Sequence, residues 1–217
     1  MNKLNTFIRF FIIIFLLFVY FASRYADFYL YFLILNVFLA YIPFEISNLT
    51  CKFNNKVIII LLSLLWLLFY PNAPYLLTDF FHLEALNIYE LTTTFNFILK
   101  DWIVFSIITC GLLFGFVIGI ISLLRIVKKL QLTFFYNESN FKTFILILLI
   151  TLASGFAIYL GRFPRLHSHY LFSNPIFILE TIIQSINLNS FIFTIAMSLW
   201  QLFIIYLIKF FKEDNII

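Results

Sequence analysis

The sequence predicts an all-α, polytopic membrane protein with six transmembrane helices and interfacial helices on the outer side. Hydrophobic residues make up 64% of the 217 residues and charged residues only 11%, whereas a soluble domain carries about 25% charged residues. The mean hydropathy is accordingly high, at +1.05. A chain of this composition cannot cover a surface that faces water, so we expect residues 1–217 to form a single integral-membrane helical domain.

A membrane-spanning helix needs about 20 predominantly apolar residues. Six stretches meet or approach this length, at 5–22, 28–45, 57–70, 102–124, 143–163 and 190–210. The first stretch resembles a signal peptide because Lys3 and Arg9 accompany its apolar run, but no small-x-small cleavage site follows, so we interpret it as an uncleaved span. All five prolines fall at or beyond the ends of these stretches, where a missing backbone N–H does least harm.

The third stretch is short for a span. Residues 57–70 would form a helix of only about 21 Å, whereas the hydrocarbon layer is about 30 Å thick. The polar motif Pro71–Asp79 would then begin below the membrane surface, where irregular backbone is tolerated only inside protein or beside a wet cavity. We therefore expect this motif to form an inset pocket.

Two segments between the spans, 71–101 and 164–189, are too apolar to be free in water. In residues 175–187, polar side chains recur every three or four positions among apolar ones, which is the spacing of one helix face. Pro175 fits the first turn, with Ser173 or Asn174 as the cap. This pattern predicts an interfacial amphipathic helix, and we expect one or two similar helices within 74–100.

The distribution of lysine and arginine predicts the orientation. With the N-terminus inside, ten of these residues lie on the cytoplasmic side: Lys3, Arg9, Lys52, Lys56, Arg125, Lys128, Lys129, Lys142, Lys209 and Lys212. Four lie outside: Arg24, Lys100, Arg162 and Arg165. We therefore predict a multi-pass protein of the cell (cytoplasmic) membrane, with both termini cytoplasmic.

Small residues recur every fourth position in the fourth and fifth spans. The two series are Gly111, Gly115 and Gly119, and Ala153, Ala157 and Gly161. Small residues at this spacing let helices approach closely in lipid. Either the two faces meet each other, which would bring Asp101 next to Arg162, or each packs on another span.

Polar side chains gather at the predicted outer ends of the spans, mainly in Pro71–Asp79 and in Gly161–Arg165 with the residues that follow. The set comprises Asn72, Tyr75, Thr78, Asp79, His82, Glu84, Asp101, Arg162, Arg165, His167, Ser168 and His169. Charge near a bilayer is costly, so such a gathering indicates a functional site.

One interpretation is a pocket for a phosphate or carboxylate, such as a lipid-linked ligand. Arg162 and Arg165 carry forked donors suited to these groups, and Asp79 and His82 are candidates for a general base and acid. Asn72, Tyr75, Thr78 and Asp101 are further candidates for ligand binding. The residues identify no cofactor.

Two other interpretations remain open. His82 with His167 and His169 offers a weaker alternative, a metal site beside Asp79, although the spacing matches no known metal motif. The structural interpretation pairs Arg162 with Asp79 or Asp101 and uses the neighbouring polar side chains to satisfy the broken backbone. Ser168 lacks the Gly-x-Ser-x-Gly surroundings of a hydrolase nucleophile.

The partners that we expect are membrane lipids and, for an accessory subunit, another membrane protein. The modest net charge of +4 follows the cytoplasmic loops and does not indicate nucleic acid. A small-solute transporter is a second alternative, but the polar residues expected near the midplane, among them Asn36, Thr151 and Gln201, are uncharged.

Three features together resemble a family of uncharacterised bacterial multi-pass membrane proteins, a domain of unknown function. They are Pro-Asn-Ala-Pro-Tyr-Leu-Leu-Thr-Asp-Phe-Phe-His-Leu at 71–83, the aspartate at 101, and Gly-Arg-Phe-x-Arg at 161–165. The resemblance covers nearly the whole chain and implies a bacterial cytoplasmic-membrane protein. It implies no activity. The sequence departs from the family's pattern at Pro164 and after Arg165, so His167 and His169 are local to this chain.

Overall fold

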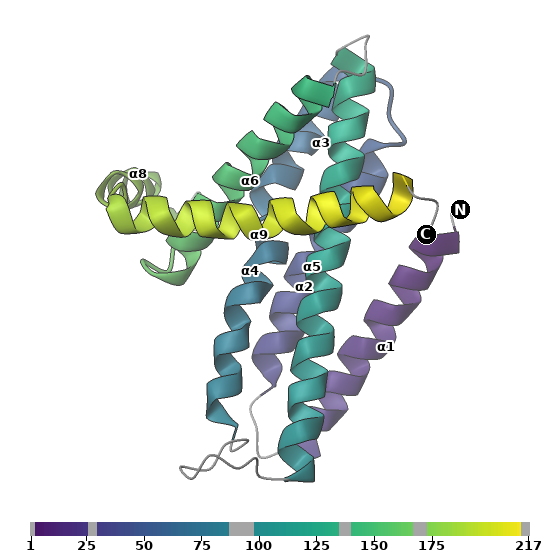
Figure 1. The fold of residues 1–217 in the computed structure, drawn as a ribbon, viewed down its shortest axis with the longest axis vertical. Helices are drawn as coiled ribbons and strands as arrows, with labels where there is room; N and C mark the ends of the chain where they lie inside the picture. Colours follow the sequence, from purple (N-terminus) through teal and green to yellow (C-terminus); the bar gives the residue numbers. More distant parts are fainter. Residues whose placement is uncertain (1–2, 26–29, 87–97, 135–139, 167–172, 214–217) are drawn as a thin grey trace.

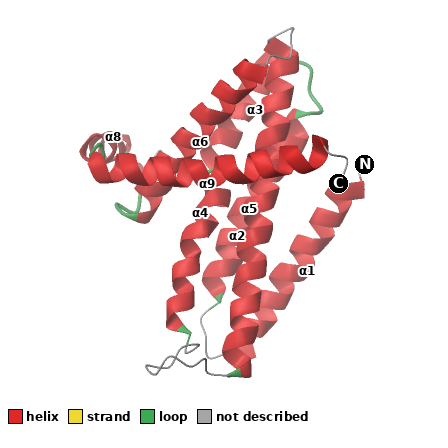
Figure 2. Cartoon of the chain, viewed as in Figure 1, coloured by secondary structure: helices red, strands yellow, loops and turns green. Residues whose placement is uncertain are grey.

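The computed structural model describes residues 3–25, 30–86, 98–134, 140–166 and 173–213, and helices dominate all of these segments (Figures 1 and 2). Six of the helical stretches are long and apolar enough to cross a membrane, as the sequence predicts. The helices are α1 (Lys3–Tyr25), α2 (Tyr31–Thr50), α3 (Lys56–Phe69), α4 (Asn72–Tyr75), the 3-10 helix η1 (Leu76–Ala85), α5 (Leu99–Phe134), α6 (Asn140–Arg162), α8 (Pro175–Gln184) and α9 (Leu188–Glu213).

The helices pack as two groups. In the first, α2 lies against α1, α3 and α5, while α4 and η1 pack on α5. In the second, α6 and α9 form an extensive pair, and this pair meets the first group through far fewer contacts. In Figure 1, α9 runs across the long axis of α5, and α8 lies at the end of the molecule away from α1. The junction between the two groups is therefore the natural place for a cleft.

The third span is longer than the sequence analysis predicts. The helix α3 ends at Phe69, but α4 and η1 continue the same path, so Lys56–Ala85 forms one interrupted span. The interruption coincides with Pro71 and Pro74, which cannot donate helical hydrogen bonds. The prediction that residues from 71 onward leave the span was wrong, whereas the predicted inset position of the motif agrees with the burial of Ala73 and Pro74.

Two further boundaries differ from the prediction. The helix α5 runs ten residues past the expected end at 124, to Phe134, and carries Arg125 with it. The helix α2 continues to Thr50, so Pro43 lies inside a helix and not at its end. The lengths of both helices were underestimated because they were judged from the apolar residues alone. Polar residues also continue a helix where neighbouring helices or lipid headgroups provide polar contacts.

The glycine series of α5 packs on the first group of helices and not on α6. A Cβ atom at Gly115 would lie 2.2 Å from Cδ1 of Leu76, and one at Gly119 would lie 2.2 Å from Cβ of Ala73. Gly111 faces Phe15 and Leu33. The alternative in which the glycine face meets another span is therefore confirmed, and the direct pairing with the small-residue face of α6 was wrong. These glycines bring α5 close to the interrupted span.

A buried polar seam joins α6 to α9 and to the end of α3. The Tyr70 hydroxyl donates to Oε1 of Gln201 at 2.9 Å, and Ser198 donates to Oγ1 of Thr151 at 2.8 Å. On α6, Gly155 allows close approach, because a Cβ there would lie 2.6 Å from the carbonyl oxygen of Thr194. Two of the polar residues expected near the midplane, Thr151 and Gln201, thus serve helix packing.

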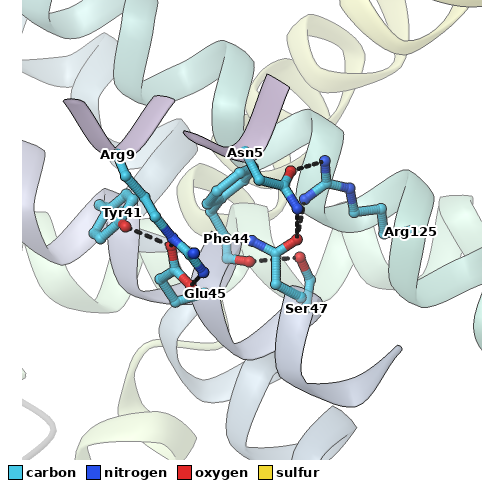
Figure 3. A network of polar contacts seen from close by, with 8 residues as sticks. Asn5, Arg9, Tyr41, Phe44, Glu45, Ser47 and Arg125 are labelled. Atoms are coloured by element: carbon cyan, nitrogen blue, oxygen red, sulfur yellow. Dashed lines mark hydrogen bonds and ion pairs between the residues drawn. The ribbon is translucent and has the colours of Figure 1, made fainter. Parts of the chain in front are cut away.

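A second polar network lies toward the C-terminal end of α2 (Figure 3). Arg9 of α1 forms two hydrogen bonds with Glu45, from Nε to Oε1 at 2.8 Å and from Nη2 to Oε2 at 2.6 Å. The Tyr41 hydroxyl also donates to Glu45. Beside this pair, Arg125 of α5 donates to Asn5 at 2.8 Å and stacks over the ring of Phe44. This network attaches α1 to α2 and α5 at one end of the bundle.

Candidate functional site

The Asp79 carboxylate lies near the opposite end of α2 from the Arg9 network. Asp79 belongs to η1, and its side chain is 1% exposed. It is buried because the glycines of α5 let the interrupted span approach closely. A carboxylate in this position needs partners from other helices, since an unpaired buried charge is costly.

Three side chains from three elements surround this carboxylate. Asn36 of α2 donates from Nδ2 to Oδ2 of Asp79 at 2.6 Å. Arg162 at the end of α6 places Nη1 3.6 Å from Oδ1, and His82, one turn along η1, places Nε2 3.9 Å from the same oxygen. We call Asn36, Tyr75, Asp79, His82 and Arg162 the Asp79 cluster. It joins the two helix groups, as the predicted pairing of Asp79 with Arg162 requires.

The two oxygens of Asp79 differ in their partners. Oδ2 accepts a short hydrogen bond, whereas Oδ1 is buried and has no hydrogen-bond partner among the described residues. Two cationic or potentially cationic groups, Arg162 and His82, lie just beyond hydrogen-bond distance of Oδ1. A small movement of either group would close a hydrogen bond, so Oδ1 is an acceptor that both can reach.

Arg162 is held by Tyr75 as well as by Asp79. Its Nη1 donates to the Tyr75 hydroxyl at 3.3 Å, and its guanidinium carbon lies 5.9 Å from the centre of the Tyr75 ring. Its side chain is 28% exposed. Within the described part of the chain, Nη2 and Nε have no protein partner, so the guanidinium keeps donors for a further group.

The sequence around Arg162 explains how the helix stops there. Pro164 prevents α6 from continuing, and Arg165 adopts a left-handed backbone conformation with φ of 55°. The Leu166 N–H then returns to the carbonyl oxygen of Leu160 at 3.0 Å. Arg165 is exposed at this turn.

Asn72 and Thr78 satisfy the broken backbone of the interrupted span. Asn72 donates from Nδ2 to the carbonyl oxygen of Phe69 at 2.9 Å, and Thr78 donates to the carbonyl oxygen of Tyr75 at 2.7 Å. Both side chains therefore do what the structural interpretation of the motif expects. The Asn72 side chain also lines a crevice between the two helix groups.

A crevice of about 490 Å³ lies at the junction of the two helix groups. Its walls are mostly apolar and come from α2, α3, α6 and α8, for example Leu39, Leu68, Ala157 and Ile178. Its polar lining residues are Asn36, Asn72 and Tyr75. Asn36 contacts Asp79 and Tyr75 contacts Arg162, so the crevice ends one side chain away from the ion pair.

The remaining predicted site residues fall in different places. Asp101 lies in the first turn of α5, partly exposed, and its membership of the site stays a prediction. Glu84 is exposed near the end of η1. His167, Ser168 and His169 lie outside the described residues. In the described part of the chain, no three metal-ligating side chains come together, so the metal alternative gains no support there.

Asn36 was missing from the predicted site. The sequence alone marks it only as an uncharged polar residue in an apolar span. The available signal was an asparagine in an apolar stretch of α2, since a polar side chain at such a position needs a partner. Phe32, one turn earlier on α2, also reaches the site, with its ring 4.0 Å from the imidazole of His82.

Comparison with protein families places the chain. A family model described as a protein of unknown function, DUF1361, matches residues 35–204, and the chain belongs to this family. The matched range contains every member of the Asp79 cluster and leaves out α1. The membership in an uncharacterised family that the motifs indicate is thereby confirmed. Searches of curated proteins and of solved structures give no significant match.

Proposed function

We propose that this DUF1361 member binds an amphiphile whose anionic head, a phosphate or a carboxylate, docks on Arg162 while its apolar part occupies the crevice. The observation that carries the proposal is the guanidinium of Arg162. It is anchored by Asp79 and Tyr75 through a single nitrogen, is partly exposed, and directly follows Gly161, which lines the crevice together with Tyr75. Arginine binds phosphate and carboxylate in a forked geometry, and its remaining nitrogens suit that role.

The crevice supports the amphiphilic nature of the ligand. Its volume of about 490 Å³ falls in the range of small-molecule sites. Its walls are mostly apolar, with only three polar lining residues, two of which contact the ion pair, and this composition matches an apolar chain with a polar head. By the positive-inside pattern, this end of the protein faces away from the cytoplasm, so the ligand would enter from the outer leaflet.

A purely structural role is the second candidate. It is favoured by Asn72 and Thr78, whose donors are used by backbone carbonyls. The double variant Asp79→Asn with Arg162→Gln separates the two roles, because it replaces the ion pair with neutral groups of similar shape. If the cluster is purely structural, this variant keeps the fold and the function of the protein, whereas if it is a binding site the variant keeps the fold and loses the binding of the anion.

Ligand binding is measurable on the protein purified in a non-ionic detergent. Decyl phosphate and decanoate should raise the thermal unfolding temperature, by an amount that corresponds to about 2.7 kcal/mol when the ligand is at 100 times its Kd. Decanol lacks the anion and inorganic phosphate lacks the chain, so both should have much smaller effects.

The arginine variants give the control for this measurement. Arg162→Gln should abolish the shift caused by decyl phosphate and decanoate. Arg24→Gln, which changes an exposed arginine on α1, should keep the shift. Equal responses to decanol and decyl phosphate in the wild-type chain would contradict the proposal.

A further inference from the structure

The Asp79 cluster contains one buried oxygen and two groups that compete for it. Oδ1 of Asp79 lies 3.6 Å from Nη1 of Arg162 and 3.9 Å from Nε2 of His82. Neither group forms a hydrogen bond with it, and Oδ1 has no other partner among the described residues. Arg162 comes from α6 across the junction, whereas His82 comes from η1 itself.

Arg162 and His82 differ in the state of their charge. An arginine side chain stays protonated in proteins, whereas histidine gains or loses its charge between about pH 5 and 8. The His82 side chain is 42% exposed and can exchange protons with water. Its ring packs on Phe32, with 4.0 Å between the ring centroids, and its Nε2 lies 3.9 Å from Oδ1 of Asp79. His82 is therefore a partner for Asp79 that becomes cationic only by taking up a proton.

We propose that anion binding at Arg162 is coupled to the uptake of one proton by His82. This inference rests on the proposed function. When the anionic head engages Nη2 and Nε of Arg162, the charge of the guanidinium is shared between the ligand and Asp79, so the buried carboxylate is less fully neutralised. A buried charge without a counterion is strongly unfavourable. His82 binds a proton from water and closes the short gap to Oδ1, so the site stays neutralised.

Other charged groups near His82 define the controls. Glu84 is on η1, and Lys100 and Asp101 lie in the first turn of α5, which packs against η1. On α2, which also contacts η1, the acidic residue is Glu45, and Arg9 already pairs with it at the other end of the helix. Glu84 and Asp101 are thus the carboxylates whose titration must be distinguished from that of His82.

The first test uses the wild-type chain and decyl sulfate, an anion that keeps its single charge throughout the range. Its affinity should fall as the pH rises from about 5 to 8, by up to about tenfold per pH unit. Calorimetry in two buffers of different ionisation enthalpy should show about one proton taken up per ligand bound in the upper part of this range. If the measured enthalpy of binding is the same in both buffers, no proton is taken up. That result would overturn the coupling and leave the proposed function intact.

Variants then assign the proton. His82→Gln should bind decyl sulfate at every pH with the weaker affinity that the wild type has at high pH. Asp79→Asn removes the charge that competes for Arg162, so it should bind more tightly at high pH and lose the pH dependence. Glu84→Gln should keep the wild-type slope. A slope that persists in His82→Gln, or that disappears in Asp101→Asn, would overturn the assignment to His82.

The same experiment separates the two levels of the proposal. If the wild-type chain binds none of decyl sulfate, decyl phosphate and decanoate at any pH, the proposed function and the coupling are overturned together. Inorganic sulfate, which lacks the alkyl chain, is the control. If inorganic sulfate binds as strongly as decyl sulfate, the ligand is a free anion and not an amphiphile. Circular dichroism of each variant confirms that it remains folded.

Discussion

The carboxylate of Asp79 and the guanidinium of Arg162 form an ion pair that crosses the junction of two helix groups, with 3.6 Å between Oδ1 and Nη1. One residue lies in η1, the last element of the interrupted span, and the other at the last position of α6. Asp79 is buried and Arg162 is partly exposed. The pair thus has one end fixed in the protein interior and one end beside the crevice.

Removal of Arg162 should destabilise the protein. Arg162→Ala leaves Asp79 buried without its cation, which should lower the free energy of unfolding by about 2–3 kcal/mol, less than for a fully buried pair because solvent reaches the guanidinium. Arg165→Ala changes an exposed arginine three residues away and should stay within about 0.5 kcal/mol. Thermal unfolding in detergent measures both, and equal losses would refute the special position of Arg162.

Close packing of α5 on the interrupted span makes Gly119 sensitive to a methyl group. Gly119→Ala would place a Cβ atom 2.2 Å from that of Ala73 and should cost about 1–3 kcal/mol. Ala73→Gly in the same chain should restore part of the loss. Gly161→Ala is the matched control, because its nearest neighbour would be 3.8 Å away. A loss in the control as large as that at Gly119 would contradict this packing.

The Tyr70 hydroxyl should contribute to the contact between the helix groups. Tyr70→Phe leaves Oε1 of Gln201 buried without its donor, and both residues are 0% exposed. The expected cost is about 1–2 kcal/mol, visible as a lower unfolding temperature. Tyr206→Phe removes a hydroxyl from an exposed tyrosine and should have little effect. If both variants unfold at the same temperature, the polar seam does not contribute to stability.

The two hydrogen bonds between Arg9 and Glu45 predict that lysine cannot replace arginine at this position. Arg9→Lys keeps the charge but loses the forked geometry. Because both side chains are about one-third exposed, the expected loss is about 1 kcal/mol. Arg24→Lys, at the exposed end of α1, is the control. The interpretation fails if double-mutant analysis with Glu45→Gln shows no coupling between residues 9 and 45.

The orientation is testable with reporter fusions. Fusions after residues 90 and 180 should report the exterior, because ten of the fourteen lysines and arginines fall on the side assigned to the cytoplasm. A fusion after residue 135 should report the cytoplasm. A cytoplasmic signal from either of the first two would reverse the topology and move the Asp79 cluster to the inner side.

The six helices and an ion pair of Arg162 with a carboxylate were predictable from sequence, although the sequence left Asp79 and Asp101 both open as the partner. Long apolar runs have few alternatives to a membrane helix, and charges in an apolar chain must find each other. The partner of the glycine series was not predictable, because small residues permit close packing without specifying the helix that approaches. Asn36 was missed for a related reason, since its role depends on which helix lies beside η1.

The extent of the third span was also underestimated. Pro71 and Pro74 were read as the end of the helix, which is their usual effect. Asn72 and Thr78 cap the carbonyls that the interruption leaves free, and this allows the path to continue to Ala85. The capping side chains were visible in the sequence, but their partners are set by local geometry.

The interrupted span also sets an order of events during synthesis. Chains are made and inserted from the N-terminus, so Asp79 enters the bilayer before Arg162 exists. An aspartate within an inserted span is unfavourable, with a cost of about 2.5–3.5 kcal/mol at the helix centre and less toward the ends. Asn36, which donates to the carboxylate, is already in place by then. The asparagine is thus the first partner of Asp79 and the arginine a later one, and the ion pair closes only after α6 has crossed the membrane.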